Sequence, residues 1–176
     1  MTLLAVAAAG GATATARRPA GTAMVGCARQ SSAGFPHAFS DPHNLRLGPL
    51  AFVGAHNGRT DTAEQIARTH GRKSPALLRP GHSAVVSIDR ADRSFARLEY
   101  SSADRTHFGR LPHTIRFVAC RRSRAESEVD GARVTFWSGF FALRRAPACV
   151  GLTVTIDGHP ALHLTLAFAR PSCPAT

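Results

Sequence analysis

The chain is poor in several residue types and has no long apolar segment. Its 176 residues include one Trp and one Tyr, and no apolar run reaches the roughly 18–20 residues that a membrane-spanning helix needs. We therefore expect no transmembrane span in the processed protein and no carbohydrate site built on a broad aromatic platform. The length suits one domain with a sizeable core, and 44% hydrophobic residues argue against wholesale disorder.

Acidic residues are also scarce, at 11 against 22 basic residues, so that the formal net charge is +11. All the basic residues but Lys73 are arginines, and they are spread from Arg17 to Arg170. The densest group, at 121–124, is followed by acids at 126–130, and we interpret both as one solvated loop. Nucleic-acid-binding proteins usually concentrate their basic residues and interleave them with aromatics. We therefore expect no specific nucleic-acid partner, only weak attraction to anionic surfaces.

Residues 1–16 are predicted to be a signal peptide. Thr2 to Ala16 is an uncharged run of small and apolar residues, of the length of a signal-peptide core. Ala14-Thr15-Ala16 has the small-x-small pattern of a signal peptidase site, so we expect cleavage after Ala16. No Lys or Arg precedes the run, which a start codon assigned too far downstream would explain. A lipoprotein processed at Cys27 and a flexible Ala/Gly-rich tail are the alternatives.

Four cysteines remain in the expected mature chain, namely Cys27, Cys120, Cys149 and Cys173. None forms a C-x-x-C pair, so neither a zinc site nor a redox motif is indicated. The even number and the predicted export favour two disulfides, for which three connectivities exist.

Short segments with alternating apolar residues predict an all-β fold. The expected strands are at 45–53, 76–78, 84–88, 95–100, 114–119, 133–143, 150–156 and 162–168. One short helix is expected at 62–69 with Asp61 as N-cap, and Gly139 predicts a bulge or a close backbone approach. Seven or eight short strands favour an antiparallel β-sandwich of immunoglobulin-like architecture over a strongly bent barrel. This single domain is placed at 45–176, after an irregular N-terminal segment at 17–44.

The last two strands must align their apolar faces, which limits the loop between them. A five-residue loop pairs Ile156 with Leu162, and a three-residue loop pairs Ile156 with Pro160. Both keep the alternating apolar residues on one face of the sheet. We prefer the five-residue loop, because Pro160 then makes no ladder hydrogen bond.

Strand direction also predicts how the cysteines pair. Cys120 ends one strand, and the next two strands reverse direction twice. Cys149 therefore begins its strand at the end of the sandwich where the last strand finishes before Cys173. We predict a Cys149–Cys173 disulfide, which leaves Cys27–Cys120 by elimination.

Residues that could carry chemistry do not form a coherent set. The nine histidines lack metal-ligand spacing, and the best local trio is His37, Asp41 and His43, which we interpret as solvated loop residues. No Gly-x-Ser-x-Gly motif occurs, and Ser138 lies inside a predicted strand. Cys120 with His56 and an Arg faintly resembles the sortase arrangement, although the sortase Thr-Leu-x-Thr-Cys motif is absent. We expect no metal, no cofactor and no catalytic residues, with Cys120 as a disulfide partner.

Several short motifs follow one another in a familiar order. They are Gly48-Pro49-Leu50-Ala51-Phe52, Arg116-Phe117-Val118-Ala119-Cys120, Phe136-Trp137-Ser138-Gly139-Phe140 and Cys149-Val150-Gly151-Leu152-Thr153-Val154. From about Leu47 to Cys173 the chain resembles a group of secreted proteins of high-GC actinobacteria to which no activity is assigned. Ser138 stands where that pattern usually has Gly. The resemblance implies location and fold, and it implies no catalytic residues.

The leading hypothesis is an exported, non-enzymatic β-sandwich module that acts at the cell envelope or outside the cell, on a partner the sequence does not identify. The alternative is a secreted cysteine-dependent hydrolase or transpeptidase that uses Cys120 with His56.

Overall fold

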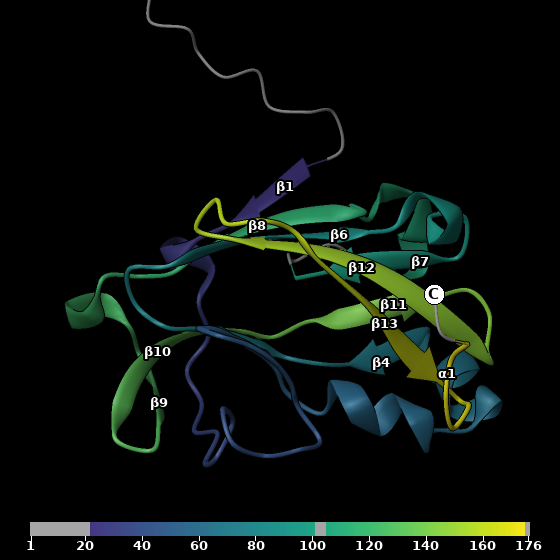
Figure 1. The fold of residues 1–176 in the computed structure, drawn as a ribbon, viewed down its shortest axis with the longest axis horizontal. Helices are drawn as coiled ribbons and strands as arrows, with labels where there is room; N and C mark the ends of the chain where they lie inside the picture. Colours follow the sequence, from purple (N-terminus) through teal and green to yellow (C-terminus); the bar gives the residue numbers. More distant parts are fainter. Residues whose placement is uncertain (1–21, 101–104, 175–176) are drawn as a thin grey trace, which may run out of the picture.

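The described part of the chain folds into three β-sheets with one α-helix beside them (Figure 1). The structure is a computed structural model, and it describes residues 22–100 and 105–174. The strand orders are β1–β8–β6–β12–β13, β2–β3–β5–β10–β9 and β4–β11–β7. The strands are β1 (Thr22–Val25), β2 (Leu45–Leu47), β3 (Leu50–Phe52), β4 (Gly71–Lys73), β5 (Ala76–Leu78), β6 (Ser83–Ile88), β7 (Ala96–Glu99), β8 (Thr114–Val118), β9 (Ser127–Val129), β10 (Ala132–Trp137), β11 (Phe140–Leu143), β12 (Ala148–Ile156) and β13 (Leu162–Phe168), and the helix is α1 (Ala63–Thr69).

An aromatic core joins the three sheets. Phe117 belongs to β8 in the first sheet, whereas Phe52 of β3 and Trp137 of β10 belong to the second sheet. The ring centroid of Phe117 lies 6.1 Å from that of Phe52 and 5.3 Å from that of Trp137. Phe141 of β11, in the third sheet, lies 5.5 Å from Phe52 and 5.8 Å from Phe168 of β13. These rings are buried, and their contacts hold the sheets face to face. The predicted all-β, sandwich-like fold is confirmed, with thirteen short strands in the described residues instead of seven or eight.

The predicted strand at 45–53 is a hairpin in the structure. β2 and β3 pair antiparallel on either side of Gly48-Pro49. Gly48 has a φ of 55°, in the left-handed region that favours glycine, and this permits the turn. The solvated loop expected at 121–130 is also partly ordered, because β9 pairs with the start of β10.

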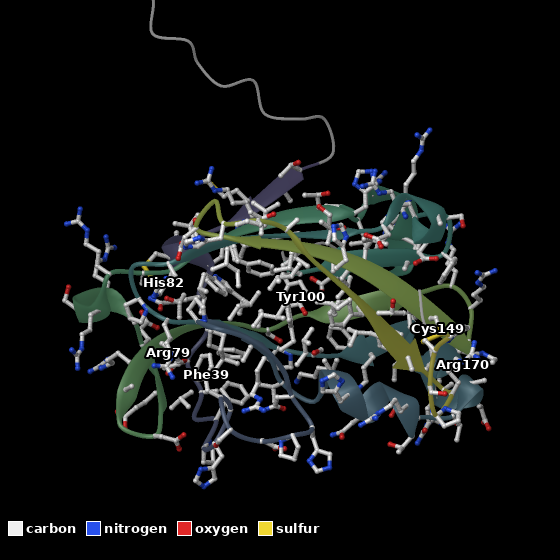
Figure 2. All side chains as sticks on the ribbon, in the orientation of Figure 1. Phe39, Arg79, His82, Tyr100, Cys149 and Arg170 are labelled. Atoms are coloured by element: carbon white, nitrogen blue, oxygen red, sulfur yellow. A yellow bond between two sulfur atoms is a disulfide. The ribbon has the colours of Figure 1, made fainter. Side chains whose placement is uncertain are left out.

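The predicted strand at 133–143 is divided between two sheets at Gly139. β10 ends at Trp137 in the second sheet, and β11 belongs to the third. A Cβ atom on Gly139 would overlap the ring of Tyr100, which lies in the interior (Figure 2). The Tyr100 hydroxyl donates to the carbonyl of Ser74, so the ring cannot move aside cheaply. The close backbone approach predicted at Gly139 is confirmed.

The N-terminal segment at 17–44 takes part in the fold from Thr22 onward. β1 pairs with β8, the only parallel pair among the strands described. The ring centroid of Phe35 lies 4.7 Å from that of Phe136. The fold therefore includes part of the segment that the sequence predicts to be irregular. A strand of four residues hardly stands out in an Ala- and Gly-rich sequence. The predicted signal peptide, residues 1–16, lies outside the described residues.

The last hairpin adopts the tighter of the two registers considered. Val154 lies opposite Leu162, which places Pro160 opposite Ile156 beyond the end of the ladder. The preferred pairing of Ile156 with Leu162 is therefore wrong, although the apolar faces align as expected. Asp157-Gly158 closes the turn with φ values of 49° and 77°. Pro160 still makes no ladder bond, because pairing ends at Leu162.

Two disulfides tie the chain together. Cys149 is bonded to Cys173 and Cys27 to Cys120, the pairings expected from strand direction. Cys149 lies at the end of the molecule where β12 begins and β13 finishes (Figure 2). Nowhere in residues 22–100 and 105–174 is a helix long and apolar enough to cross a membrane.

Candidate functional site

A hollow of about 570 Å³ opens beside β4, between α1 and the 3-10 helix η2 (Ala55–Arg59). We call it the β4 groove. Four apolar side chains line part of it, namely Val53, Ile66, Pro75 and Phe140. Four charged side chains line it as well, namely Asp61, Arg68, Arg72 and Lys73. The groove therefore offers both apolar surface and charge to a ligand.

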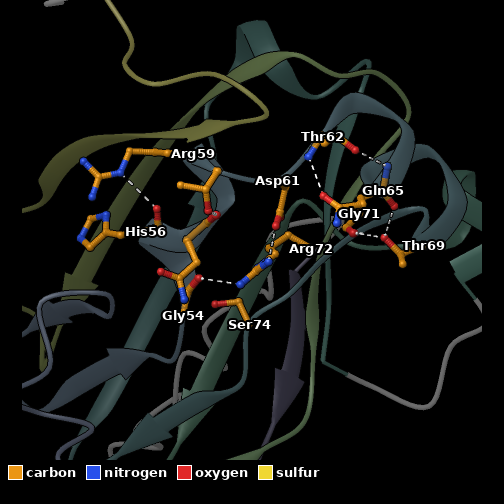
Figure 3. Close-up of polar contacts among 12 residues, drawn as sticks. Gly54, His56, Arg59, Asp61, Thr62, Gln65, Thr69, Gly71, Arg72 and Ser74 are labelled. Carbon is orange, nitrogen blue, oxygen red and sulfur yellow. Dashed lines mark hydrogen bonds and ion pairs between the residues drawn. The ribbon is translucent and has the colours of Figure 1, made fainter.

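Helix α1 forms one wall, and its start is fixed by a capping box. The Thr62 hydroxyl accepts a hydrogen bond from the Gln65 N–H at 3.1 Å, and the Gln65 side chain accepts one from the Thr62 N–H at 2.7 Å (Figure 3). The prediction of Asp61 as N-cap is wrong by one residue. This shift matters for the groove, because it leaves the Asp61 carboxylate available to another partner.

The helix ends in a sharp turn that leads into β4. His70 is the C-cap, with a φ of 54°, and Gly71 follows with a φ of 139°. A Cβ atom on Gly71 would overlap the backbone of Phe141 in the neighbouring strand β11. Glycine is therefore required for β4 to pair this closely with β11 directly after the helix.

Asp61 pairs with Arg72 across the groove. Arg72 Nη1 lies 2.5 Å from Asp61 Oδ1, and Arg72 Nη2 donates to the carbonyl of Gly54 at 3.4 Å (Figure 3). The carboxylate side chain is 14% exposed and the guanidinium side chain 24%. Arg72 Nε is buried and has no partner among the described residues. The pair links the segment before α1 to β4, and Asp61 compensates the charge of Arg72.

The remaining charges of the groove are uncompensated. Arg68 on α1 and Lys73 on β4 are exposed, and neither makes an ion pair with a described residue. Since Asp61 is the only acidic residue of the lining and is bonded to Arg72, the groove carries a net positive charge. Beside it, burial lowers the pKa of His56, and the nearby charges of Arg59 and Arg46 lower it further.

The two residues of the alternative, cysteine-dependent site belong to different elements of the fold. Cys120 follows β8, is buried and is bonded to Cys27. His56 is in η2, the helix that packs against β13. The sulfur of Cys120 is therefore not a thiolate in this structure, and its neighbour is Gln30 instead of a histidine.

His37, Asp41 and His43, which the sequence analysis interprets as solvated loop residues, belong to two separate pairs. His43 Nδ1 lies 2.9 Å from Asp41 Oδ1, whereas His37 Nδ1 lies 3.4 Å from Asp130 Oδ1 on the β9–β10 turn. These contacts hold loops together. In the part of the chain that the structure describes, no three His, Cys, Asp or Glu residues are grouped as metal ligands.

Sequence reasoning missed the residues of the β4 groove. Asp61 and Arg72 are eleven positions apart, and no motif relates them. Only the capping box, a Thr-x-x-Gln pattern at 62–65, was a readable signal that Asp61 is not the cap. Comparison with protein-family models, curated proteins and solved structures finds no match to this chain.

Proposed function

We propose that this protein is an exported, non-catalytic β-sandwich module that acts at the cell envelope or outside the cell and holds an anionic, partly apolar ligand in the β4 groove. The observation that carries the proposal is the groove itself, in which three cations face a single carboxylate beside apolar surface. A ligand with carboxylate groups and aliphatic side chains, such as an acidic peptide segment, matches both properties.

The disulfides support an extracytoplasmic location. Both pairs of cysteines are bonded, and no cysteine is free. Disulfides persist in oxidising compartments and are rare where thiols are kept reduced. Together with the sequence pattern at 1–16 and the resemblance to secreted actinobacterial proteins, they favour export over a cytoplasmic role.

The state of Cys120 supports a non-catalytic role. The cysteine-dependent alternative needs a thiolate close to a histidine, whereas the Cys120 sulfur is bonded to Cys27 and lies next to Gln30. Thiol titration of the native and of the denatured, non-reduced protein separates the two hypotheses. We expect no titratable thiol in either state, and a free, fast-reacting Cys120 would favour the enzyme.

The groove can be probed through Lys73, because it is the only lysine of the chain. Acetylation of the mature protein then modifies only Lys73 and the N-terminal amine, which serves as an internal reference. The probe is an N-acetylated peptide of alternating Glu and Leu, and the matched peptide has Gln in place of Glu. We expect the acidic peptide to slow acetylation of Lys73 relative to the N-terminus, and the Gln peptide to have no effect.

A charge-reversal pair tests whether the groove, and not the overall charge, is responsible. Arg68→Glu should weaken binding of the acidic peptide by about tenfold, because it places a carboxylate at the groove. Arg121→Glu changes the net charge equally on an exposed residue outside the groove and should have little effect. Equal weakening by both variants would show that the net charge of +11 explains the attraction and would refute the groove as the site.

A further inference from the structure

A second group of cations surrounds the ring of Phe108, on the 3-10 helix η4 (Arg105–Arg110). The guanidinium carbon of Arg97, on β7, lies 5.0 Å from the ring centroid, and that of Arg144, directly after β11, lies 4.4 Å from it. The charge of Arg93 acts on both Arg97 and His113, and the charge of Arg97 also acts on His113. We call these five residues the Phe108 cation cluster.

No described carboxylate neutralises the cluster. Within the described ranges, its three arginines and His113 form no ion pair. Burial lowers the pKa of Arg97, and the charges of Arg144 and Arg93 lower it further. Burial also lowers the pKa of His113, followed by the charges of Arg93 and Arg97. The cations therefore repel one another, which is an arrangement that a bound anion would relieve.

The backbone and the ring hold these side chains in place. Arg93 Nε donates to the Ile88 carbonyl at 2.9 Å, and the Ile88 N–H donates to the His113 carbonyl at 2.8 Å. The Arg144 N–H donates to the Phe95 carbonyl at 2.9 Å, so the end of β11 is fixed to the start of β7. A guanidinium stacked on an aromatic ring loses little further freedom when it binds a ligand.

Hydrogen-bond donors remain available in this arrangement. Arg97 uses Nη1 for the carbonyl of Ala96, and Arg93 uses Nε for that of Ile88. Arg144 is exposed, its guanidinium lies over the Phe108 ring, and no hydrogen bond joins that guanidinium to another described residue. A planar guanidinium donates two parallel hydrogen bonds to the oxygens of a phosphate or sulfate group. We expect several arginines this close together to favour such a group over a single carboxylate.

We propose that the Phe108 cation cluster is a binding site for a tetrahedral oxyanion, a phosphate or sulfate group, with Arg97 and Arg144 as its principal ligands. This site is distinct from the β4 groove and goes beyond the function proposed above. The group would come either from a soluble phosphate compound or from the headgroup of an anionic lipid.

The test uses the mature protein with two probes, inorganic pyrophosphate and vesicles of phosphatidylcholine with phosphatidylglycerol. The double variant Arg97→Gln/Arg144→Gln should weaken binding of the probe by about tenfold or more, because each substitution removes charge-assisted hydrogen bonds to its phosphate group. Arg144→Gln alone is a second variant, because Arg144 is exposed and its loss should not affect folding. The matched control is Arg29→Gln with Arg121→Gln, which removes the same charge from two exposed residues outside the cluster.

An independent readout is the titration of His113 by NMR. Bound pyrophosphate should raise the pKa of His113, because an anion stabilises the protonated ring. Loss of pyrophosphate binding in the cluster variants identifies a soluble phosphate compound as the ligand, and loss of vesicle binding alone identifies a lipid phosphate. Arg68→Glu, in the β4 groove, should leave pyrophosphate binding unchanged, so the two proposals fail separately. Equal weakening by the control, or no binding of either probe, would overturn the proposal.

Discussion

Removal of the Cys149–Cys173 disulfide should destabilise the protein less than removal of Cys27–Cys120. The first bridge spans a sequence separation of 24 residues and the second one of 93. In the chain-entropy model these loops correspond to about 3.5 and about 4.7 kcal/mol of stabilisation, respectively. Cys149 and Cys173 are half-buried, so Ser fits there easily, whereas Cys120 is buried and Ser at that position adds a desolvation cost of about 1 kcal/mol.

The location of the bridge predicts where the structure opens first. Among the described strands, β13 lies at the edge of its sheet and pairs only with β12, and the disulfide closes the end of this pair away from the Asp157-Gly158 turn. Leu166 and Phe168 are buried, and the Ala169 N–H donates to the Gly58 carbonyl at 2.7 Å. These contacts should keep the core folded without the bridge, while the end of β13 frays.

Two measurements on the double variants Cys149→Ser/Cys173→Ser and Cys27→Ser/Cys120→Ser check this reasoning. Urea unfolding gives the two losses in the free energy of unfolding, and amide hydrogen exchange locates the opening. In the first variant, exchange should accelerate at the end of β13 more than in β6 or β8. If the first variant loses as much stability as the second, or exchange accelerates uniformly, then loop length and strand position do not govern the effect.

Three further predictions rest on local contacts. Gly139→Ala should lower the free energy of unfolding by about 2 kcal/mol in urea unfolding, because the added methyl group meets the buried Tyr100 ring; an unchanged midpoint would contradict the close approach. Thr62→Ala should lower it by about 1 kcal/mol through loss of the helix cap, measured in the same way, and Thr62→Ser should restore it. The pKa values of His56 and His113 lie below 6.5 in the folded protein, so unfolding takes up protons and stability should fall as the pH decreases below about 6.5. Replacing both histidines with Gln should flatten the stability profile in this range.

Export can be tested directly on protein recovered from culture medium. We expect N-terminal sequencing to find the mature chain beginning near Arg17, after the predicted cleavage at Ala16. An intact Met1 in the cytosolic fraction would contradict the signal peptide and, with it, the extracytoplasmic part of the proposed function.

Period-two alternation was a sufficient signal for most of the strands. Ile115 and Phe117 alternate with polar neighbours, and both are buried on one face of β8. The same holds for the apolar residues of β12, which pair in aligned register with those of β13. Alternation is a property of the chain itself, because successive side chains of a strand point to opposite faces wherever the strand lies.

Breaks within strands and very short strands were not predictable in this way. Gly139 stood out in the sequence and Gly48 did not, and only the packing around them shows that Gly48 closes a hairpin and Gly139 separates two sheets. β1 has four residues in a segment rich in Ala and Gly, and its partner β8 lies about ninety residues away in the sequence. Its pairing depends on a long-range contact that no local pattern reports.

By itself, the sequence determined the fold class, the faces of the long strands and, through strand direction, which cysteines are neighbours. The tertiary structure decided the number of sheets, the tight turn at 157–159 and both candidate sites. Asp61 and Arg72 meet only because α1 turns back onto β4, and Arg97 and Arg144 both lie over the ring of Phe108 only because β7 and β11 pair. Side-chain alternation is local and can be read along the chain, whereas a binding site is a meeting of distant residues, which arises only when the sheets have packed.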